Sequence, residues 1–304
     1  MSITVLAWLG TDVMLQMVLA LIMLGVGLSL RLSDFRYVLD NGRLLITGLA
    51  LKILFLPLLG WLLAMPFALP VAWQFGILLL LFTPGGTTSN VITYWFGGTS
   101  ALTIFLTTLS GFITILTIPL FVNWGSWYYW GVGTAIRLPF WSTVGNIFFV
   151  IVLPALLGLW VRHKRPGEAV KLERFLRPVA VVLLGLVYLI KFFAPSDAGG
   201  SGITMAEVVK LLPPLLLLNV VAMWMGFQIA VQTGINRRDS MTIGIEMGVQ
   251  NAALALLIGS VYLQNEDFVK PALVYGMFTF WTTAAFGWVI SRFFSRKKGR
   301  DSDI

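Results

Sequence analysis

An acidic residue within a long apolar stretch is the first feature of this sequence that could carry chemistry. Glu246 lies in segment 243–251, between two glycines and shortly before Gln250 and Asn251. A carboxylate at the depth of a membrane is costly to bury, so it usually faces a protein interior or a wet cavity and marks the path of an ion or substrate. The glycines and amides disfavour a continuous lipid-facing helix, and we predict a helix that is interrupted near the membrane centre.

A second candidate site follows a proline and two glycines at positions 84–86. This run removes one backbone donor and two side chains, so a helix must break here and leave carbonyl groups unpaired. Oxygen-bearing side chains follow on this segment and the next: Ser89, Asn90, Thr103, Thr107 and Ser110. The last three share one helix face because their spacing is i, i+4 and i+7. Hard cations bind such oxygens, although a stripe of hydroxyl residues is also typical of closely packed membrane helices.

A lysine lies deep in another apolar segment. From Arg43 to Lys52 the chain advances about nine residues, which corresponds to ~13 Å of helix and places Lys52 near the bilayer midplane. A lysine stem can reach back over only part of that distance. We therefore predict that Lys52 pairs with Glu246, because a nearby carboxylate favours the charged ammonium. Lys191, by contrast, lies near the end of its segment and can extend to the interface.

The elements that carry these residues are predicted to be membrane helices. Hydrophobic residues make up 58% of the 304 positions and charged residues 11%, whereas a soluble protein has about 25% charged residues. We predict an all-α polytopic membrane protein with about nine spans, each close to the ~20 residues that a bilayer requires. The apolar segments are 14–30, 44–65, 71–95, 102–124, 143–161, 179–193, 211–231, 241–262 and 271–290.

The basic residues indicate how this protein is oriented in the bilayer. Most of the 21 Lys and Arg residues fall in loops on one side, within 31–43, 162–177, 237–238 and 292–300. Only Arg137, Lys210 and Lys270 fall in loops on the other side. The positive-inside rule then places the N-terminus outside and the C-terminus in the cytoplasm. The first segment lacks the features of a removable signal peptide and is expected to stay.

Other classes of protein and site fit this sequence less well. The net charge of +8 comes from short topological loops, and no basic patch is long enough to follow a nucleic acid. The absence of cysteine excludes thiol catalysis and Cys-based metal sites. The lone histidine, His163, lies in a basic loop, where a solvated role is expected. An intramembrane aspartyl protease needs two acids and only Glu246 is available, so we expect no enzyme.

Two broken helices at comparable places in two halves of a chain are typical of secondary transporters. By the segment count, the two interrupted spans run in opposite directions, as an inverted repeat requires. Residues 84–91 and 246–251 resemble the two signature stretches of the bile acid:sodium symporter family, and the stretch from 25–28 to Asp34 and Phe35 is similar to its early segment. The resemblance covers nearly the whole chain.

The resemblance implies one transporter domain over 1–304 that works by alternating access. Its core contains two crossing broken helices, here within 44–124 and 211–290. A panel of helices, here 14–30 and 143–193, packs against that core. The chain looks like a bacterial-type member with nine spans, so we expect a multi-pass protein of the bacterial inner (cell) membrane.

The resemblance also implies two sodium sites, with sodium as the coupling ion and no cofactor. Its first sodium site corresponds to Ser89, Asn90, Thr103, Thr107 and Glu246. Its second corresponds to Glu246, Gln250 and the carbonyls around Met247 and Val249, together with a glutamine whose place is held here by Lys52. Our hypothesis is that the Lys52 ammonium replaces the second sodium. The alternative is a static Lys52–Glu246 pair that ties two helices.

The substrate is much less determined by the sequence. The resemblance implies an organic anion, either bile-acid-like or a small carboxylate, and Asn90, Asn251 and Thr282 are the candidate contacts. Thr282 and its neighbour Thr283 could equally be packing residues. A proton-coupled or sodium-independent carrier that uses Lys52 and Glu246 is the main alternative, and a channel is a further one.

Overall fold

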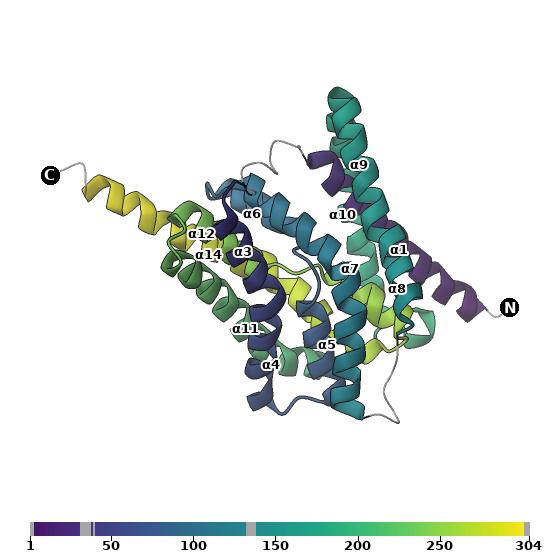
Figure 1. Cartoon of the computed structure of the whole chain (residues 1–304). Helices are drawn as coiled ribbons and strands as arrows, with labels where there is room; N and C mark the ends of the chain where they lie inside the picture. The colour runs from purple at the N-terminus through teal and green to yellow at the C-terminus, as the bar shows by residue number, and fades with distance from the viewer. Residues whose placement is uncertain (1–2, 31–37, 39, 132–137, 301–304) are drawn as a thin grey trace.

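The fold is a bundle of helices (Figure 1), seen in a computed structural model that describes residues 3–30, 38, 40–131 and 138–300. Among these residues no strand forms, and the one isolated β-bridge joins Gly85 to Gln250. Several predicted features lie outside the described residues: Asp34 and Phe35 of the early segment, and the basic loop residues Arg31, Arg36 and Arg137.

Seven helical segments of the described chain are long and apolar enough to cross a membrane, judged by length and composition. Four are single helices: α1 (Ile3–Ser29), α7 (Ser100–Trp130), α10 (Pro166–Phe193) and α11 (Met205–Gln232). Three are compound: α3 (Gly42–Ala50), η1 (Leu51–Phe55), α4 (Leu56–Ala64) and η2 (Met65–Phe67); α8 (Phe140–Ile147), η3 (Phe148–Val152) and α9 (Leu153–Lys164); and η6 (Glu266–Phe268) with α14 (Lys270–Arg300). A short turn, η4 (Ser196–Ala198), lies between α10 and α11.

Two further segments are interrupted, as the sequence predicts. α5 (Val71–Leu81) is separated from α6 (Thr88–Trp95) by the Pro-Gly-Gly stretch. α12 (Arg237–Gly248) ends just after Glu246, and α13 (Ala252–Leu256) with η5 (Leu257–Tyr262) continues beyond a short gap. Both breaks leave backbone groups without helical partners, and these groups form the candidate site described below.

Proline shapes the helices in ways that the segment count did not predict. α10 begins at Pro166, far before the predicted start at 179, because Pro178 is accommodated inside the helix. Pro57 and Pro154 each follow a wide π-helical turn, η1 and η3 respectively. Proline lacks an N–H and its ring displaces the carbonyl one turn back, so the preceding turn widens. Lys52 lies in η1, where this widening occurs.

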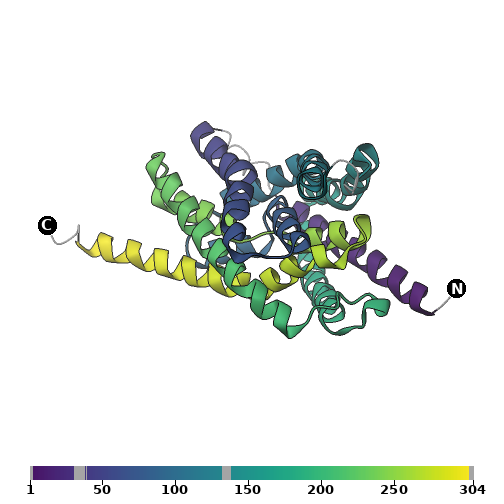
Figure 2. The ribbon, with the colours of Figure 1, turned by 90° about the horizontal axis from the view of Figure 1, so that it is seen from below.

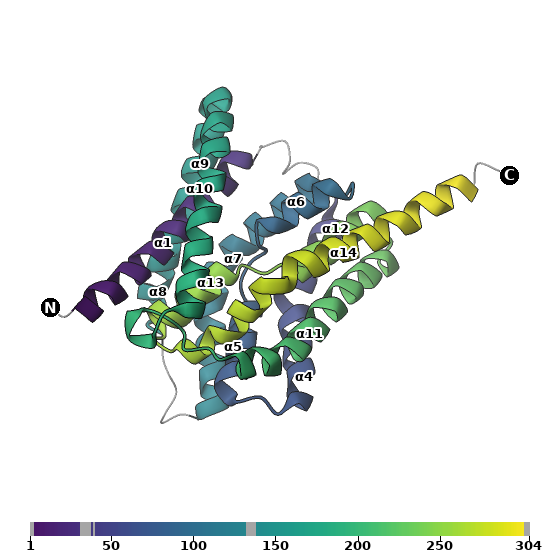
Figure 3. The ribbon, with the colours of Figure 1, turned by 180° about the vertical axis from the view of Figure 1, so that it is seen from behind.

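The helices pack in two groups. α1 lies against α9 and α10, whereas α11 lies against α12 and α14, and α14 also contacts α5. α14 runs as one long diagonal beside α11, and the two chain ends project on opposite sides (Figures 2 and 3). Large apolar side chains on the outside, such as Trp141, Phe193 and Trp281, are at least 70% exposed, as expected for a surface covered by lipid.

The bundle has two ends, which we name after residues. The Arg165 end carries the α9–α10 connection, where Arg165 lies, and the α11–α12 connection. There the Thr99 hydroxyl donates to Asp239, and Arg238 donates to the Gly98 carbonyl. The Lys191 end carries the α10–α11 and α13–α14 connections, and Lys191 lies in the last turn of α10.

Two glycines allow α1 and α9 to approach closely, and substituting one should separate them. A Cβ atom on Gly158 would lie 2.4 Å from the Leu24 carbonyl oxygen, and one on Gly27 would lie 2.0 Å from the Ala155 carbonyl oxygen. We expect Gly158→Ala to lower the free energy of unfolding by about 1–3 kcal/mol through overpacking. The control is Gly185→Ala, since a Cβ there meets nothing within 4 Å. Thermal unfolding followed by tryptophan fluorescence compares them; equal melting temperatures would contradict the prediction.

Candidate functional site

The two helix interruptions lie against each other and are joined by backbone hydrogen bonds. The Gly86 N–H donates to the Val249 carbonyl (3.3 Å), and the Asn251 N–H donates to the Pro84 carbonyl (2.9 Å). A Cβ on Gly86 would lie 2.8 Å from the Gln250 carbonyl oxygen, so this approach requires glycine. The two breaks therefore satisfy part of each other's unpaired backbone.

The Glu246 carboxylate packs over Gly85 at this junction. A Cβ on Gly85 would lie 1.8 Å from Glu246 Oε1, so only glycine leaves room for the carboxylate. Oε1 accepts a hydrogen bond from the Thr107 hydroxyl (2.8 Å), whereas Oε2 is buried without a hydrogen-bond partner. Glu246 is 2% exposed. A buried carboxylate oxygen without a donor is costly unless a cation or another donor reaches it.

The other residues predicted for the first sodium site lie in α6, just after the Pro-Gly-Gly break, and in α7. Asn90 Oδ1 is also buried without a partner. The Ser89 hydroxyl lies beside the Glu246 carboxylate but donates to the Gly86 carbonyl (2.8 Å). The Thr103 hydroxyl donates to Thr93 (3.0 Å). The candidate ligands of this site are therefore carboxylate, amide and hydroxyl oxygens, which suit a hard cation.

Lys52 reaches the C-terminus of α12. Its ammonium donates to the carbonyls of Glu246 (3.1 Å) and Val249 (3.3 Å) and to Gln250 Oε1 (2.5 Å). Gln250 in turn donates to the Met247 carbonyl (2.9 Å). These are the groups predicted for the second cation site, and here they already bind the ammonium and the amide.

The Lys52–Glu246 relation differs from the predicted pair. No hydrogen bond or ion pair joins the ammonium to the Glu246 carboxylate, both of which belong to the described residues. The lysine instead binds the backbone carbonyl of that residue. The two charges still interact electrostatically. The ammonium prefers the carbonyls because the last carbonyls of a helix lack intrahelical donors.

A buried group of donors around the Gly248 carbonyl was not predicted from the sequence. Asn219 Nδ2 (2.7 Å), the Tyr275 hydroxyl (2.7 Å) and the Thr279 hydroxyl (2.8 Å) all donate to this oxygen. Asn219 also donates to the Tyr275 hydroxyl (2.8 Å). The available signals were an asparagine inside an apolar run and the i, i+4 spacing of Tyr275 and Thr279 on one face of α14.

The predicted substrate contacts are less clearly gathered at this site. Asn251 adjoins the break, where its side chain caps α13 by accepting from the Leu254 N–H (3.0 Å). The Thr282 hydroxyl donates to carbonyls of its own helix, Phe278 (3.3 Å) and Thr279 (3.2 Å). Its neighbour Thr283 has a buried hydroxyl without a partner. The structure therefore brings Asn90 and Asn251 to the two breaks and leaves Thr282 bonded within α14.

The chain is similar in sequence to known proteins. Residues 16–197 match the Sodium Bile acid symporter family. The chain is 28% identical over 268 residues to the probable sodium/metabolite cotransporter BASS2, chloroplastic, of Oryza sativa subsp. japonica, covering 88% of this chain and 61% of that protein. It is 26% identical to the ileal sodium/bile acid cotransporter of Cricetulus griseus (87% and 74% covered). It is 28% identical to the sodium-dependent organic anion transporter of Rattus norvegicus (76% and 61%). The chain thus spans about three fifths of the rice and rat proteins.

The close packing of Glu246 on Gly85 predicts that a single methyl group disrupts the site. Gly85→Ala places a Cβ on the carboxylate, and we expect it to lower the free energy of unfolding by about 1–3 kcal/mol as overpacking does. Gly111→Ala on α7 is the matched control, because its nearest contact, Pro84 Cβ, is 4.0 Å away. Thermal melts of the purified variants measure the difference. A Gly85→Ala protein as stable as Gly111→Ala would show that the carboxylate is not held there.

Proposed function

The chain belongs to the sodium bile acid symporter family, and from this premise we propose that it is a secondary active transporter that couples sodium to the uptake of an organic anion. The relatives named above are sodium-dependent carriers, for bile acid or organic anions in two cases. The apolar helices and the family together make the chain a multi-pass membrane protein. A carrier of this class works by alternating access and catalyses no chemical reaction.

One observation carries the proposal: two buried oxygens without hydrogen-bond partners, Glu246 Oε2 and Asn90 Oδ1, come from the two helix breaks. A dehydrated sodium ion needs such oxygens in place of its water ligands. With Ser89, Thr103 and Thr107 they form the proposed sodium site. Binding there neutralises the carboxylate and connects the two breaks, so sodium can favour one arrangement of the helices over another.

We infer the architecture that this function requires. The seven continuous segments and the two interrupted ones make nine spans, related as an inverted repeat. The core comprises the helices within 44–124 and 211–290, and the panel those within 14–30 and 143–193. In line with the loop charges, the Arg165 end faces the cytoplasm and the Lys191 end faces outward, in the inner membrane of a bacterial cell.

Lys52 takes the place of the second sodium in this proposal. Its ammonium donates to two carbonyls and one amide oxygen at the end of α12, and those oxygens would otherwise be available to a cation. The charges of one sodium, Lys52 and Glu246 sum to +1, the same as two sodium ions with Glu246. The site still attracts a monoanion, for which Asn90 and Asn251 are the proposed contacts, with Thr282 as a more distant candidate.

A second candidate is a proton-coupled carrier. Lys52 and Glu246 are both buried and interact electrostatically, and a proton taken up by the carboxylate could replace the sodium ion. A channel is less favoured because the two breaks are closed by hydrogen bonds to each other. The dependence of uptake on sodium and pH separates these candidates.

The first test of sodium coupling removes the charge of the Glu246 carboxylate. Glu246→Gln retains the shape of the side chain but removes its charge, and we expect it to abolish sodium-driven uptake of an organic anion into proteoliposomes. Potassium gradients of equal ionic strength give the background. Glu168→Gln is the control, because the Glu168 side chain is 65% exposed on α10. Sodium-dependent uptake by the Glu246→Gln protein would refute the proposed sodium coupling.

The second test asks whether the Lys52 ammonium replaces a sodium ion. An ion that binds only the folded protein raises its stability by about 2.7 kcal/mol at 100 times its Kd. We expect sodium, compared with matched potassium, to stabilise the wild type without cooperativity, and Lys52→Gln to make the dependence cooperative because a second sodium enters. The exposed Arg165→Gln serves as the control for loss of a positive charge. A sodium response unchanged by Lys52→Gln refutes the replacement, and no sodium response at any pH favours proton coupling.

A further inference from the structure

A buried ion pair joins the two groups of helices at the Lys191 end. Lys191 Nζ lies 2.7 Å from Glu266 Oε1, with the lysine side chain 4% exposed and the glutamate 21% exposed. Lys191 belongs to α10, which packs with α1 and α9. Glu266 begins η6, which packs on α5 and η5. The pair therefore links the proposed panel to the proposed core. The sequence suggested that Lys191 extends to the membrane interface, but its side chain is buried in this pair.

A close helix contact lies one turn away from the pair on the same face of α10. A Cβ on Gly276 of α14 would lie 2.2 Å from the Tyr188 hydroxyl oxygen, so the tyrosine packs directly on the glycine. Tyr188 and Lys191 are spaced i, i+3 and thus point the same way. α10 is held against α14 and η6 by a packed ring and by an ion pair.

One oxygen of this ion pair has no hydrogen-bond partner. Glu266 Oε2 is buried without a hydrogen-bond partner. Asp12 of α1, a second carboxylate, interacts electrostatically with both Lys191 and Glu266. Breaking a buried ion pair leaves uncompensated charge unless water reaches both groups. The Lys191–Glu266 pair can therefore separate at low cost only where water reaches both groups.

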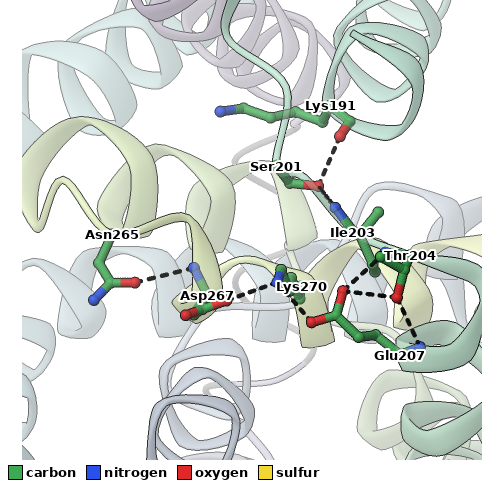
Figure 4. A network of polar contacts seen from close by, with 8 residues as sticks. All are labelled: Lys191, Ser201, Ile203, Thr204, Glu207, Asn265, Asp267 and Lys270. Atoms are coloured by element: carbon green, nitrogen blue, oxygen red, sulfur yellow. Dashed lines mark hydrogen bonds and ion pairs between the residues drawn. The ribbon is translucent and has the colours of Figure 1, made fainter. Parts of the chain in front are cut away.

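A second set of ion pairs, centred on Lys270, lies near the Lys191 backbone (Figure 4). Lys270 at the start of α14 pairs with Glu207 of α11 (2.8 Å) and with Asp267 (2.7 Å). α11 and α14 already pack along each other. The Lys270 pairs therefore stay within the proposed core. Lys191 reaches this region through its carbonyl, which accepts from the Ser201 hydroxyl (2.7 Å).

We propose that the Lys191–Glu266 pair, supported by Tyr188 on Gly276, is the latch that closes the Lys191 end and must open once in every transport cycle. The inference rests on the proposed carrier function and names the residues that close one side of the pathway. The Lys270 pairs are a static tie and do not open.

Crosslinking tests the latch directly, because the chain contains no cysteine of its own. In the double variant Lys191→Cys/Glu266→Cys, a short bifunctional thiol crosslinker should lower uptake by proteoliposomes about tenfold or more by holding the gate shut, and a reductant should restore it. The control is Glu207→Cys/Lys270→Cys, where the same crosslink should leave more than half of the uptake. Equal uptake by crosslinked and reduced Lys191→Cys/Glu266→Cys protein overturns the latch.

Thiol labelling decides the matter if the reduced double variant does not transport. Ser201 is buried beside the Lys191 carbonyl, so a thiol introduced by Ser201→Cys should react slowly with a membrane-impermeant maleimide. Adding Glu266→Gln should raise the labelling rate about fivefold or more by opening this end, whereas Lys270→Gln should not. Equal rates in the two backgrounds overturn the latch.

Sodium-dependent stabilisation, measured on the same proteins, separates the two proposals. If sodium stabilises the protein but the crosslink has no effect on uptake, the latch is rejected and sodium coupling is retained. Crosslinking that blocks an uptake independent of sodium rejects sodium coupling and retains the latch.

Discussion

The structure depends on one constraint: a helix that ends inside a membrane must find donors for its last carbonyls within the protein. α12 ends at Gly248, and the carbonyls of the four residues 246–249 each accept a hydrogen bond from a side chain. Lys52 supplies those of Glu246 and Val249, Gln250 supplies that of Met247, and a buried asparagine, tyrosine and threonine supply that of Gly248. Three helical segments are positioned by this requirement: η1 through Lys52, α11 through Asn219, and α14 through Tyr275 and Thr279.

The same requirement bears on the cation site that we propose at the junction. Where a side chain donates to each carbonyl, the helix end is complete and needs no ion. The Glu246 Oε2 and Asn90 Oδ1 atoms are different, since both are buried without a hydrogen-bond partner. On the proposed function, the protein thus fills one cation position permanently with an ammonium and leaves the other to sodium. The division follows from where the donors are placed.

Much of this arrangement follows from particular residues of the sequence, and some of it does not. Glu246 and the glycines of 84–86 predict broken helices because few other roles suit them inside an apolar segment. Lys52 lies in the turn widened before Pro57 and binds carbonyls, not the carboxylate, and neither feature can be read from residue spacing alone. Asn219 and Tyr275 are far apart in sequence, and only packing brings them to one oxygen. The predicted segment 179–193 covers only the second half of α10, because the helix continues through Pro178.

A fixed ammonium has a consequence for coupling that a second ion does not share. A bound sodium ion is released in each cycle, and its gradient contributes to the driving force. Lys52 stays on its helix, so it supplies positive charge to an anion but no energy from a gradient. On the proposed function, this protein therefore moves fewer ions per substrate than a relative with two sodium sites, and it accumulates its substrate less steeply. The site still attracts an anion, and the positive charge that Lys52 contributes does not depend on the sodium concentration.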